Sequence, residues 1–337
     1  MFKKIALAAV ASMLALAHIN AEAQVAFLEI RPPDSNDISG FYNKIYFVED
    51  SFGYLVGEQT LEDEKAIVSF SRDKGKSWEI KAQLAPDRLM GGAFVDEKHG
   101  WVVGERGSVI HTRDGGENWR IQTSKVSVDL QSVFFLDEKV GWAVGSNSTV
   151  VHTDSGGRSW DILLGGTPSE NVGEGEITFL DVHFFDEKNG VLVGAGAEGV
   201  VMITSDGGTT WVVVHKSSAN YASLAFGDKN NGWVVGQDGM VEATTDGGKT
   251  WTPQNSGVEE YLKDVAAADG KTAWLSGDNG TIGYTADGGK TWSLVEVPVT
   301  IFGKKSPLKR PVTGIAAFKK KAWAVTDFGR VFHFQLQ

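Results

Sequence analysis

Residues 100–119 read GWVVGERGSVIHTRDGGENW, and the motifs at both ends of this stretch recur along the chain. The end motif, Thr-Arg-Asp-Gly-Gly-Glu-Asn-Trp at residues 112–119, has close copies that finish at Trp78, Trp211, Trp251 and Trp292. A further copy finishes at Trp160 and has Ser155 where the others have the aspartate. Successive copies end 40 or 41 residues apart, except for one interval of 51. Such a period is typical of repeat proteins.

The start motif, Gly-Trp-Val-Val-Gly at residues 100–104, recurs upstream of each end motif and once more near the C-terminus. Its seven related copies begin at residues 53, 100, 141, 190, 232, 273 and 322. The chain has eleven tryptophans, of which six finish the end motif and five lie in the start motif. We therefore assign every tryptophan to the fold and none to a ligand-stacking platform.

Each repeat contains four short segments with strand character, separated by turns. In the third repeat these segments are residues 130–136, 142–144, 149–153 and 160–164, with Asp- and Gly-rich sequence between them. Short strands with tight turns at this period predict an all-β fold, with one four-stranded β-propeller blade per repeat. Seven repeats predict seven blades.

The two ends of the chain favour a closed ring over an open solenoid. The last repeat offers three strands, at residues 312–317, 322–325 and 330–334, and the segment 25–30 precedes the first repeat. We expect residues 25–30 to supply the missing fourth strand of the last blade, since this pairing would hide the sheet edges.

Composition limits the classes of function. The 337 residues include no Cys, which excludes disulfides, thiolate metal sites and a lipid-modified cysteine. The net charge of −11 argues against nucleic acid or an anionic membrane surface as the main partner.

The first residues have the pattern of an export signal. Lys3 and Lys4 precede an apolar run at residues 5–17, and Ala21 and Ala23 provide the small residues that a signal peptidase recognises. We expect cleavage after Ala23, which leaves one propeller domain at residues 24–337. The mature protein would then be periplasmic or secreted, without a lipid anchor or direct membrane insertion. The alternative is an uncleaved N-terminal anchor.

The end motif has a structural explanation. Asp114 is expected to accept hydrogen bonds from N–H groups of its own turn, Gly116 to adopt a positive φ, and Trp119 to pack between blades. The equivalent residues are Asp73, Asp206, Asp246 and Asp287, with Trp78, Trp160, Trp211, Trp251 and Trp292. One aspartate per blade gives no converging ligand set, so we expect no metal and no cofactor.

The end motif is the Asp-box, or BNR, repeat of sialidases and other propellers. Paired with Gly-Trp-x-Val-Gly, it resembles the photosystem II assembly/stability factor family over residues 25–337. That resemblance implies an exported, non-enzymatic scaffold in photosynthesis or a related process, binding a protein partner such as a membrane-protein or envelope complex. We expect a monomer that does not bind nucleic acid.

Two other functions remain open from the sequence. One is an Asp-box exo-glycosidase of the sialidase type, and the other is an accessory subunit of an envelope complex. A sialidase needs three arginines around a carboxylate and a Tyr/Glu nucleophile pair, and no such pair can be assigned. No catalytic residue is therefore predicted.

Five arginines are expected on one rim of the ring, in the fourth-to-first connections and second-to-third loops. They are Arg31, Arg88, Arg106, Arg310 and Arg330. Lys304, Lys305 and Lys309 would join them through an insertion at residues 299–311. We interpret this basic arc as a site for an acidic or carboxylate-bearing partner segment, and the alternative is an ordinary mixed-charge rim.

Overall fold

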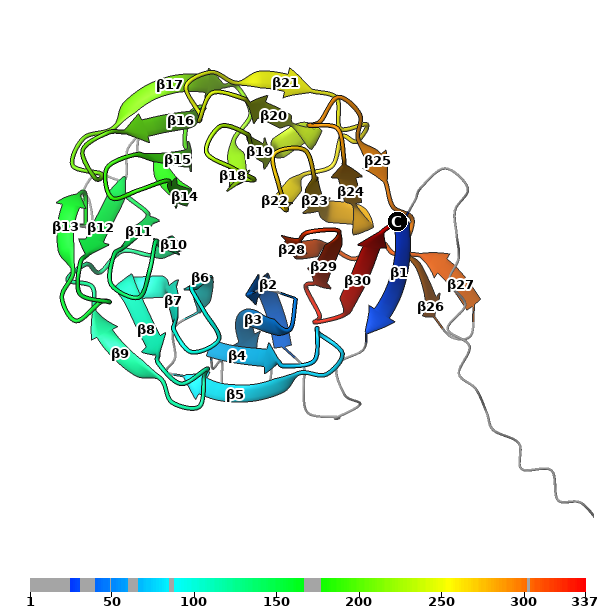
Figure 1. Cartoon of the computed structure of the whole chain (residues 1–337), viewed down its shortest axis with the longest axis horizontal. Coiled ribbons are helices and arrows are strands. Elements are labelled where there is room, and N and C mark those ends of the chain that lie inside the picture. The colour runs from blue at the N-terminus through cyan, green and yellow to red at the C-terminus, as the bar shows by residue number, and fades with distance from the viewer. Residues whose placement is uncertain are drawn as a thin grey trace, which may run out of the picture.

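The computed structural model describes residues 25–30, 40–48, 50–59, 66–84, 88–166, 177–301 and 304–337. They form seven four-stranded antiparallel sheets that follow one another around a ring (Figure 1). The predicted all-β fold, a seven-bladed β-propeller, is confirmed. The expected leader at residues 1–23 lies outside the described residues.

The four strands of each blade follow one another from the centre of the ring outward. Blade 1 has β2 (Gly40–Val48), β3 (Phe52–Gln59), β4 (Ala66–Ser71) and β5 (Glu79–Leu84). Blade 2 has β6 (Leu89–Phe94), β7 (Gly100–Gly104), β8 (Ser108–Thr112) and β9 (Arg120–Thr123). Blade 3 has β10 (Leu130–Phe135), β11 (Gly141–Gly145), β12 (Thr149–Thr153) and β13 (Asp161–Leu164). Blade 4 has β14 (Thr178–Phe184), β15 (Gly190–Ala195), β16 (Gly199–Thr204) and β17 (Val212–Ser217). Blade 5 has β18 (Tyr221–Phe226), β19 (Gly232–Gly236), β20 (Val241–Thr244) and β21 (Thr252–Gln254). Blade 6 has β22 (Leu262–Ala267), β23 (Ala273–Gly277), β24 (Ile282–Thr285) and β25 (Ser293–Leu294). Blade 7 has β28 (Val312–Phe318), β29 (Lys321–Thr326), β30 (Val331–Leu336) and β1 (Val25–Ile30).

Blade 7 joins the two ends of the described chain. Strand β1 pairs with β30 in an antiparallel register that runs from Val25↔Leu336 to Ile30↔Val331. Figure 1 shows the blue β1 beside the red β30. The predicted closure of the ring by residues 25–30 is therefore confirmed. The other strands of this blade end one or two residues beyond their predicted ends, and β30 begins one residue later than predicted.

Aromatic side chains of the start motif fill the space between neighbouring blades. Trp101 of β7 stacks on Phe135 of blade 3, and Trp142 of β11 stacks on Phe184 of blade 4, each with ring centroids 3.6 Å apart. Both tryptophans are fully buried. The repeat thus places a stacked Trp–Phe pair at each of these two interfaces, which explains why Trp is favoured there.

Each innermost strand carries a β-bulge at the same place. The register shifts between Leu130 and Ser132 in β10, between Phe179 and Asp181 in β14, and at the equivalent residues of the other blades. A bulge turns the following side chains relative to the partner strand. The first residue after the bulge lines the central channel in blades 1 to 6.

The insertion expected at residues 299–311 forms a hairpin outside the blades. It consists of β26 (Pro298–Ile301) and β27 (Lys304–Pro307). Three short 3-10 turns, η1 (Glu105–Gly107), η2 (Gln237–Gly239) and η3 (Asp278–Gly280), connect second to third strands. Among the described residues, no helix has the length and apolar character needed to cross a membrane.

Candidate functional site

The two ends of the ring differ in their loops. The box face carries the first-to-second turns, such as residues 136–140, and the third-to-fourth hairpins with the Asp-boxes. The loop face carries the second-to-third loops, such as η1, and the fourth-to-first connections. Antiparallel pairing within each blade fixes this division.

Asp114 ties together the hairpin of its Asp-box. Its Oδ1 accepts the backbone N–H of Asn118 at 2.8 Å, and its Oδ2 accepts the side-chain amide of Asn118 at 2.8 Å. The Thr112 hydroxyl donates to Asp114 and accepts the N–H of Gly116 at 2.8 Å. Asp73, Asp206, Asp246 and Asp287 make the corresponding contacts to their own turns.

The altered box keeps part of this pattern. Ser155 Oγ accepts the N–H of Ser159 at 3.2 Å, and Thr153 Oγ1 accepts the N–H of Gly157 at 2.9 Å. A serine therefore replaces the carboxylate and provides one neutral acceptor.

The tryptophans that finish the boxes differ in burial. Three are buried, namely Trp78, Trp160 and Trp251, and three are half-buried, namely Trp119, Trp211 and Trp292.

Four of the five predicted arginines lie on the loop face, and Arg31 lies outside the described residues. Arg88 and Arg106 are neighbours in blade 2, where the Arg88 carbonyl accepts the N–H of Glu105 at 3.0 Å. The Arg88 guanidinium lies 3.6 Å from the carboxylate of Glu58. Arg310 and Arg330 lie in blade 7 and line the same groove. The structure thus gives two arginine pairs, separated in ring order by blade 1.

The groove beside Arg310 has mixed character. It has a volume of about 480 Å³ between the end of the β26–β27 hairpin and the second-to-third loop of blade 7. The Arg310 guanidinium binds Asp327 through both oxygens, at 2.6 and 3.2 Å, and lies 3.9 Å from the ring centre of Phe328. Phe328 is 51% exposed and contacts Phe41 with ring centroids 5.0 Å apart. An exposed aromatic pair next to arginines suits a segment with both apolar and acidic groups.

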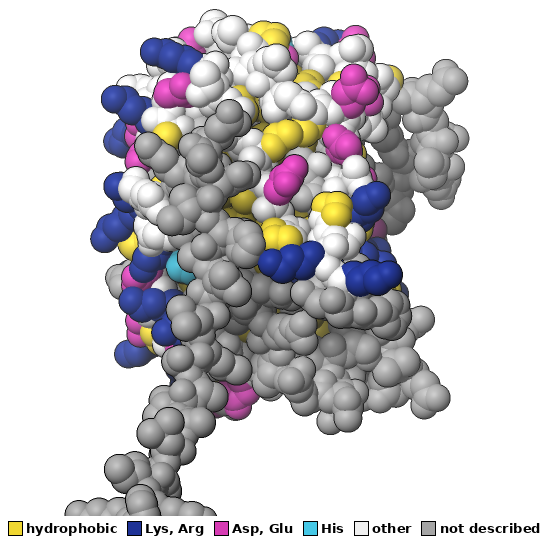
Figure 2. Space-filling view, turned by 90° about the vertical axis from the view of Figure 1, so that its right-hand side faces the viewer, with side chains coloured by type: hydrophobic (Ala, Val, Ile, Leu, Met, Phe, Trp, Pro, Cys, Tyr) yellow, Lys and Arg dark blue, Asp and Glu magenta, His cyan; other side chains and the backbone are white. Residues whose placement is uncertain are grey.

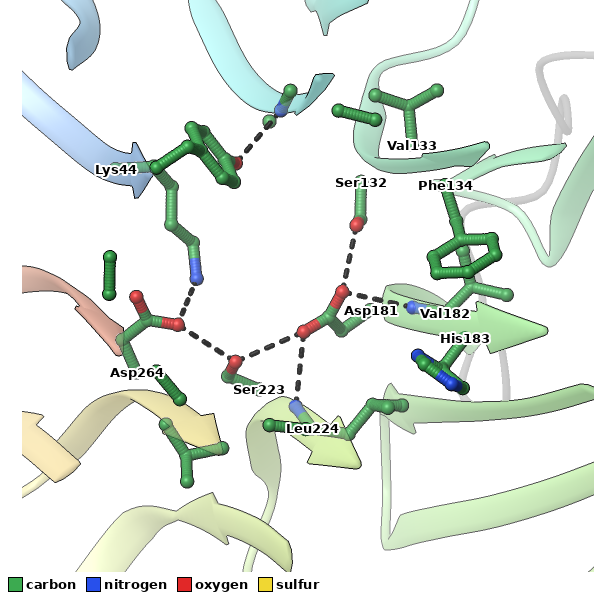
Figure 3. Close-up of a pocket in the computed structure, with 18 of the residues that line it drawn as sticks. Lys44, Ser132, Val133, Phe134, Asp181, Val182, His183, Ser223, Leu224 and Asp264 are labelled. Carbon is green, nitrogen blue, oxygen red and sulfur yellow. Dashed lines mark hydrogen bonds and ion pairs between the residues drawn. The ribbon is translucent and has the colours of Figure 1, made fainter. Parts of the chain in front are cut away.

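A second polar site lies in the central channel, and the sequence reasoning missed it (Figure 3). The channel pocket, about 360 Å³ in volume, is lined by residues of all seven innermost strands. Asp181 of blade 4 accepts the Ser132 hydroxyl at 2.8 Å and the backbone N–H groups of Val182 and Leu224, both at 3.0 Å. The Ser223 hydroxyl lies 3.0 Å from the same carboxylate. These contacts link blades 3, 4 and 5.

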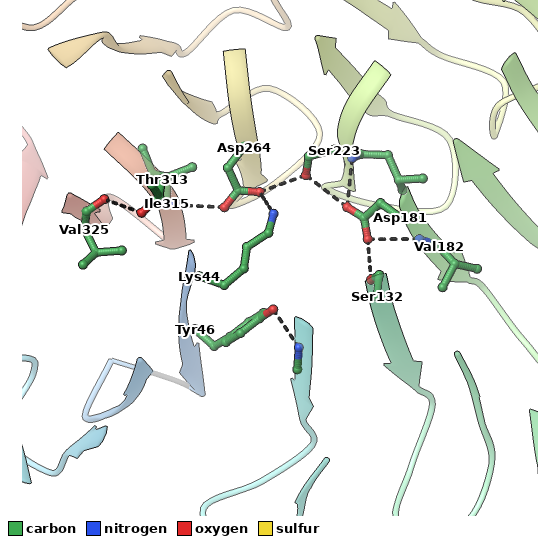
Figure 4. Close-up of polar contacts among 12 residues, drawn as sticks. Lys44, Tyr46, Ser132, Asp181, Val182, Ser223, Asp264, Thr313, Ile315 and Val325 are labelled. Carbon is green, nitrogen blue, oxygen red and sulfur yellow. Dashed lines mark hydrogen bonds and ion pairs between the residues drawn. The ribbon is translucent and has the colours of Figure 1, made fainter. Parts of the chain in front are cut away.

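The network continues around the ring in Figure 4. Ser223 Oγ also lies 2.9 Å from Asp264 of blade 6, whose other oxygen accepts the N–H of Ile315 in blade 7 at 2.9 Å. Lys44 of blade 1 donates to Asp264 at 2.5 Å. Tyr46, also in blade 1, accepts the N–H of Gly92 in blade 2 at 2.8 Å. We call these residues the channel belt.

Charge in the channel belt is partly balanced. Burial acts to lower the pKa of Lys44, but the nearby carboxylates of Asp264 and Asp181 outweigh it, so the pKa lies above its ordinary value. Burial raises the pKa of Tyr46, which stays neutral. Burial also lowers the pKa of His183, farther along the channel, to about 4. The carboxylates are held by donors from the ring itself, an arrangement that favours structural linkage of the blades.

Five of the belt residues share one structural position, the first residue after the bulge of their strand. In blades 1 and 3 to 6 this residue is Lys44, Ser132, Asp181, Ser223 and Asp264. These five positions hold lysine, serine or aspartate, so no repeated motif marks them in the sequence. Only an alignment of the seven innermost strands with one another could have shown that these residues share a position.

Charges on the outer surface are mixed. On the side shown in Figure 2, lysine and arginine side chains alternate with acidic ones along one edge, and hydrophobic side chains are scattered between them. Among the described residues, no group of three or more His, Cys, Asp or Glu is placed to hold a metal ion.

Seven four-stranded blades, six of them with an Asp-box hairpin, define the class of this protein as an Asp-box β-propeller. Within that class, the chain belongs to the family of the photosynthesis system II assembly factor YCF48. The sequence profile of that family matches residues 74–170, 169–253 and 212–335, which together span more than half of the chain. The resemblance stated from the motifs is therefore confirmed.

Solved structures agree with the fold. A structure described as YCF48 bound to D1 peptide has a TM-score of 0.69 at 20% identity, covering 92% of this chain and 97% of that chain. YCF48 from Cyanidioschyzon merolae has a TM-score of 0.68 at 19% identity, covering 92% and 98%. The WD40 repeats of RRP9 reach 0.67 at 11% identity, covering 92% and 97%, so this likeness concerns fold alone. A comparison with curated proteins gives no match.

Proposed function

We propose that this protein is an exported, non-enzymatic assembly factor that holds a segment of a membrane protein during assembly of a larger complex. The leader at residues 1–23 would direct export, and residues 24–337 would act as a monomeric propeller in the periplasm or outside the cell. Family membership supports the assembly role. The relative solved with a D1 peptide is a precedent for binding a segment of another protein.

The groove of blade 7 is the proposed binding site for the partner segment. Phe328 is exposed, Arg310 lies over its ring, and Arg330 lines the same groove. Arginine binds carboxylates through paired hydrogen bonds, and an exposed ring gains free energy when a partner covers it. We therefore propose a partner segment that carries an apolar side chain next to an acidic side chain or a C-terminal carboxylate.

Site-specific photo-crosslinking in intact cells tests this function. A benzophenone amino acid in place of Phe328 should capture one membrane protein, identified by mass spectrometry. The matched control places the same amino acid at Ile121, which is 75% exposed on the outer strand of blade 2. Identical products from both positions, or only soluble proteins from position 328, would contradict the proposal.

The contribution of charge is tested with the captured segment as a synthetic peptide. Arg310→Gln and Arg330→Gln should each weaken its binding about tenfold, and added salt should reduce the difference. Arg113→Gln, at an exposed position in an Asp-box, is the control. A peptide amide that binds as well as the free acid would place the recognised carboxylate in a side chain.

A further inference from the structure

The β26–β27 hairpin and the first three strands of blade 7 are more basic than the chain as a whole. Residues 297–337 contain eight lysines and arginines and one aspartate, although the whole chain has a net charge of −11. Five of these basic residues belong to the loop-face groove and its hairpin. The three others are consecutive on the box face: Lys319 and Lys320 form the first-to-second turn, and Lys321 begins β29.

The fold does not require lysine in this turn. In blades 2 to 6 the equivalent turn opens with an aspartate whose Oδ1 accepts two backbone N–H groups. Asp137, for example, accepts those of Lys139 and Val140 at 2.7 and 2.8 Å. In blade 7 the turn is shorter, and Lys319 adopts a φ of 55°, a region that glycine or asparagine favours. Some property other than turn stability therefore explains the lysines.

The neighbouring Asp-box of blade 1 enlarges the basic surface. The Lys74 carbonyl accepts the indole N–H of Trp323 at 2.9 Å, which fixes this box against blade 7. Lys74 and Lys76 are exposed, as are Lys319 and Lys320. We call the group Lys74, Lys76, Lys319, Lys320 and Lys321 the lysine cluster.

Two carboxylates offset part of this charge. Asp50 accepts Lys321 at 2.6 Å and Lys74 at 3.3 Å, and Asp73 is held by the N–H and hydroxyl of Ser77 in its own box. The lysines outnumber these two aspartates, and their positive charge also affects a neighbouring histidine. Burial first, and then Lys321, Lys74 and Lys76, lower the pKa of His333 to about 4.

We propose that the lysine cluster is a docking site for an anionic lipid surface. Lysine is a flexible point charge that suits phosphate groups on a surface without fixed geometry, whereas arginine suits the paired contacts of a carboxylate. The cluster spreads over two turns beside a shallow hollow lined by Asp50, Phe318 and Gln335. The negative net charge of the whole chain does not reveal this region, in which five lysines lie close to two aspartates. The loop face stays open for the partner segment.

Co-sedimentation with lipid vesicles tests the site. The full mature chain should bind phosphatidylglycerol vesicles in low salt and not phosphatidylcholine vesicles. Lys319→Gln with Lys320→Gln should weaken binding about tenfold or more, since each lysine near an anionic surface contributes about fivefold. This double variant leaves the Lys321–Asp50 pair intact, and an unchanged melting temperature would show that it folds.

The matched control changes Lys139→Gln and Lys188→Gln, which are exposed in the equivalent turns of blades 3 and 4. Equal losses in the two double variants, or equal binding to both lipids, would overturn the proposal. Binding of the wild type to polyglutamate through Lys319 and Lys320 without binding to vesicles would also overturn it, in favour of an acidic protein partner. Capture of a segment by the loop face does not enter this measurement, so the two proposals fail independently.

Discussion

Lys44 and Asp264 lie 220 residues apart in the chain, and the Lys44 ammonium donates to the Asp264 carboxylate at 2.5 Å inside the central channel. Lys44 belongs to blade 1 and Asp264 to blade 6, so the contact reaches past blade 7, the blade that closes the ring. Asp264 also holds the backbone of blade 7 at Ile315. The channel belt therefore reinforces the closure made by β1 and β30.

Lys44→Met should reduce the free energy of unfolding by about 2 kcal/mol, because it leaves Asp264 and Asp181 in the channel without their cation. The Lys44 side chain is 23% exposed, so the loss is smaller than for a fully buried pair. Urea unfolding measures the difference. Lys263→Met is the control, since Lys263 pairs with Asp278 at 3.2 Å on the surface and should cost less than about 1 kcal/mol.

The pH dependence of this effect has a defined sign. The pKa of Lys44 is raised in the folded protein, so its stabilisation is fully present below the ordinary lysine pKa of about 10.4. The difference between wild type and Lys44→Met should stay constant from neutral pH to about pH 9 and shrink only at higher pH. A difference that vanishes near neutral pH would contradict the assigned pairing.

Asp114→Ala should cost about 1 kcal/mol, because the Asn118 N–H and side chain lose their acceptor. Asp114→Ser should recover part of that loss, since Ser155 fills this role in the box of blade 3. Ser155→Ala should cost less than Asp114→Ala. Thermal unfolding of the three variants tests the order, and equal losses would show that the carboxylate does not anchor the hairpin.

Acid should destabilise the protein through its buried histidines. Burial first, and then Arg113 and other cations, lower the pKa of His111 to about 4, while the unfolded chain has the ordinary value of about 6.5. The unfolded state binds more protons below that value, so stability falls as the pH decreases from about 6.5 toward 4. His111 would account for about 2 kcal/mol at pH 5.

His111→Phe tests this assignment. The His111 ring stacks on Trp101 with centroids 4.5 Å apart, and its Nε2 has no hydrogen-bond partner among the described residues, so phenylalanine suits the site. The variant should lose less stability than wild type between about pH 7 and pH 5, as measured by urea unfolding. Parallel pH profiles would show that His111 does not titrate as assigned.

Two buried tryptophans should respond differently to replacement by phenylalanine. Trp142 donates its indole N–H to the Gly207 carbonyl, in the Asp-box of the next blade, at 2.8 Å. The Trp274 N–H has no hydrogen-bond partner among the described residues. The next blade, blade 7, has no Asp-box that could supply the equivalent carbonyl. Trp142→Phe should therefore cost about 1 kcal/mol more than Trp274→Phe. Chemical denaturation of both variants decides this, and an equal cost would assign the effect to lost volume.

The repeat allowed the fold to be predicted almost completely. Glycine-bounded turns and regularly spaced tryptophans mark the blades. The strand at residues 25–30 could be assigned to the last blade because the last repeat offers only three strands. Each of these signals is local in sequence or repeated. The hairpin of β26 and β27 had neither property and was predicted only as an insertion.

The channel belt could not be predicted from the repeated motifs, for a physical reason. Asp181 and Asp264 meet Ser223 only because the bulge in each of these innermost strands directs one side chain toward the ring axis. The sequence does not mark the bulge, and the side chains that follow it differ in size and charge. The arginines were placed on a common rim from topology alone, whereas the contact of Arg310 with Phe328 depends on the conformation of one loop.

The pairing of β1 with β30 also sets an order of events during folding. Strand β1 precedes all the other described strands in the chain, and its partner β30 follows all of them. Blades 1 to 6 each consist of strands that are consecutive in the chain, so they can form while β1 still lacks its partner. The ring is therefore completed only when the two ends of the described chain come together, and a chain cut before residue 331 has an exposed strand at each end of its unfinished ring.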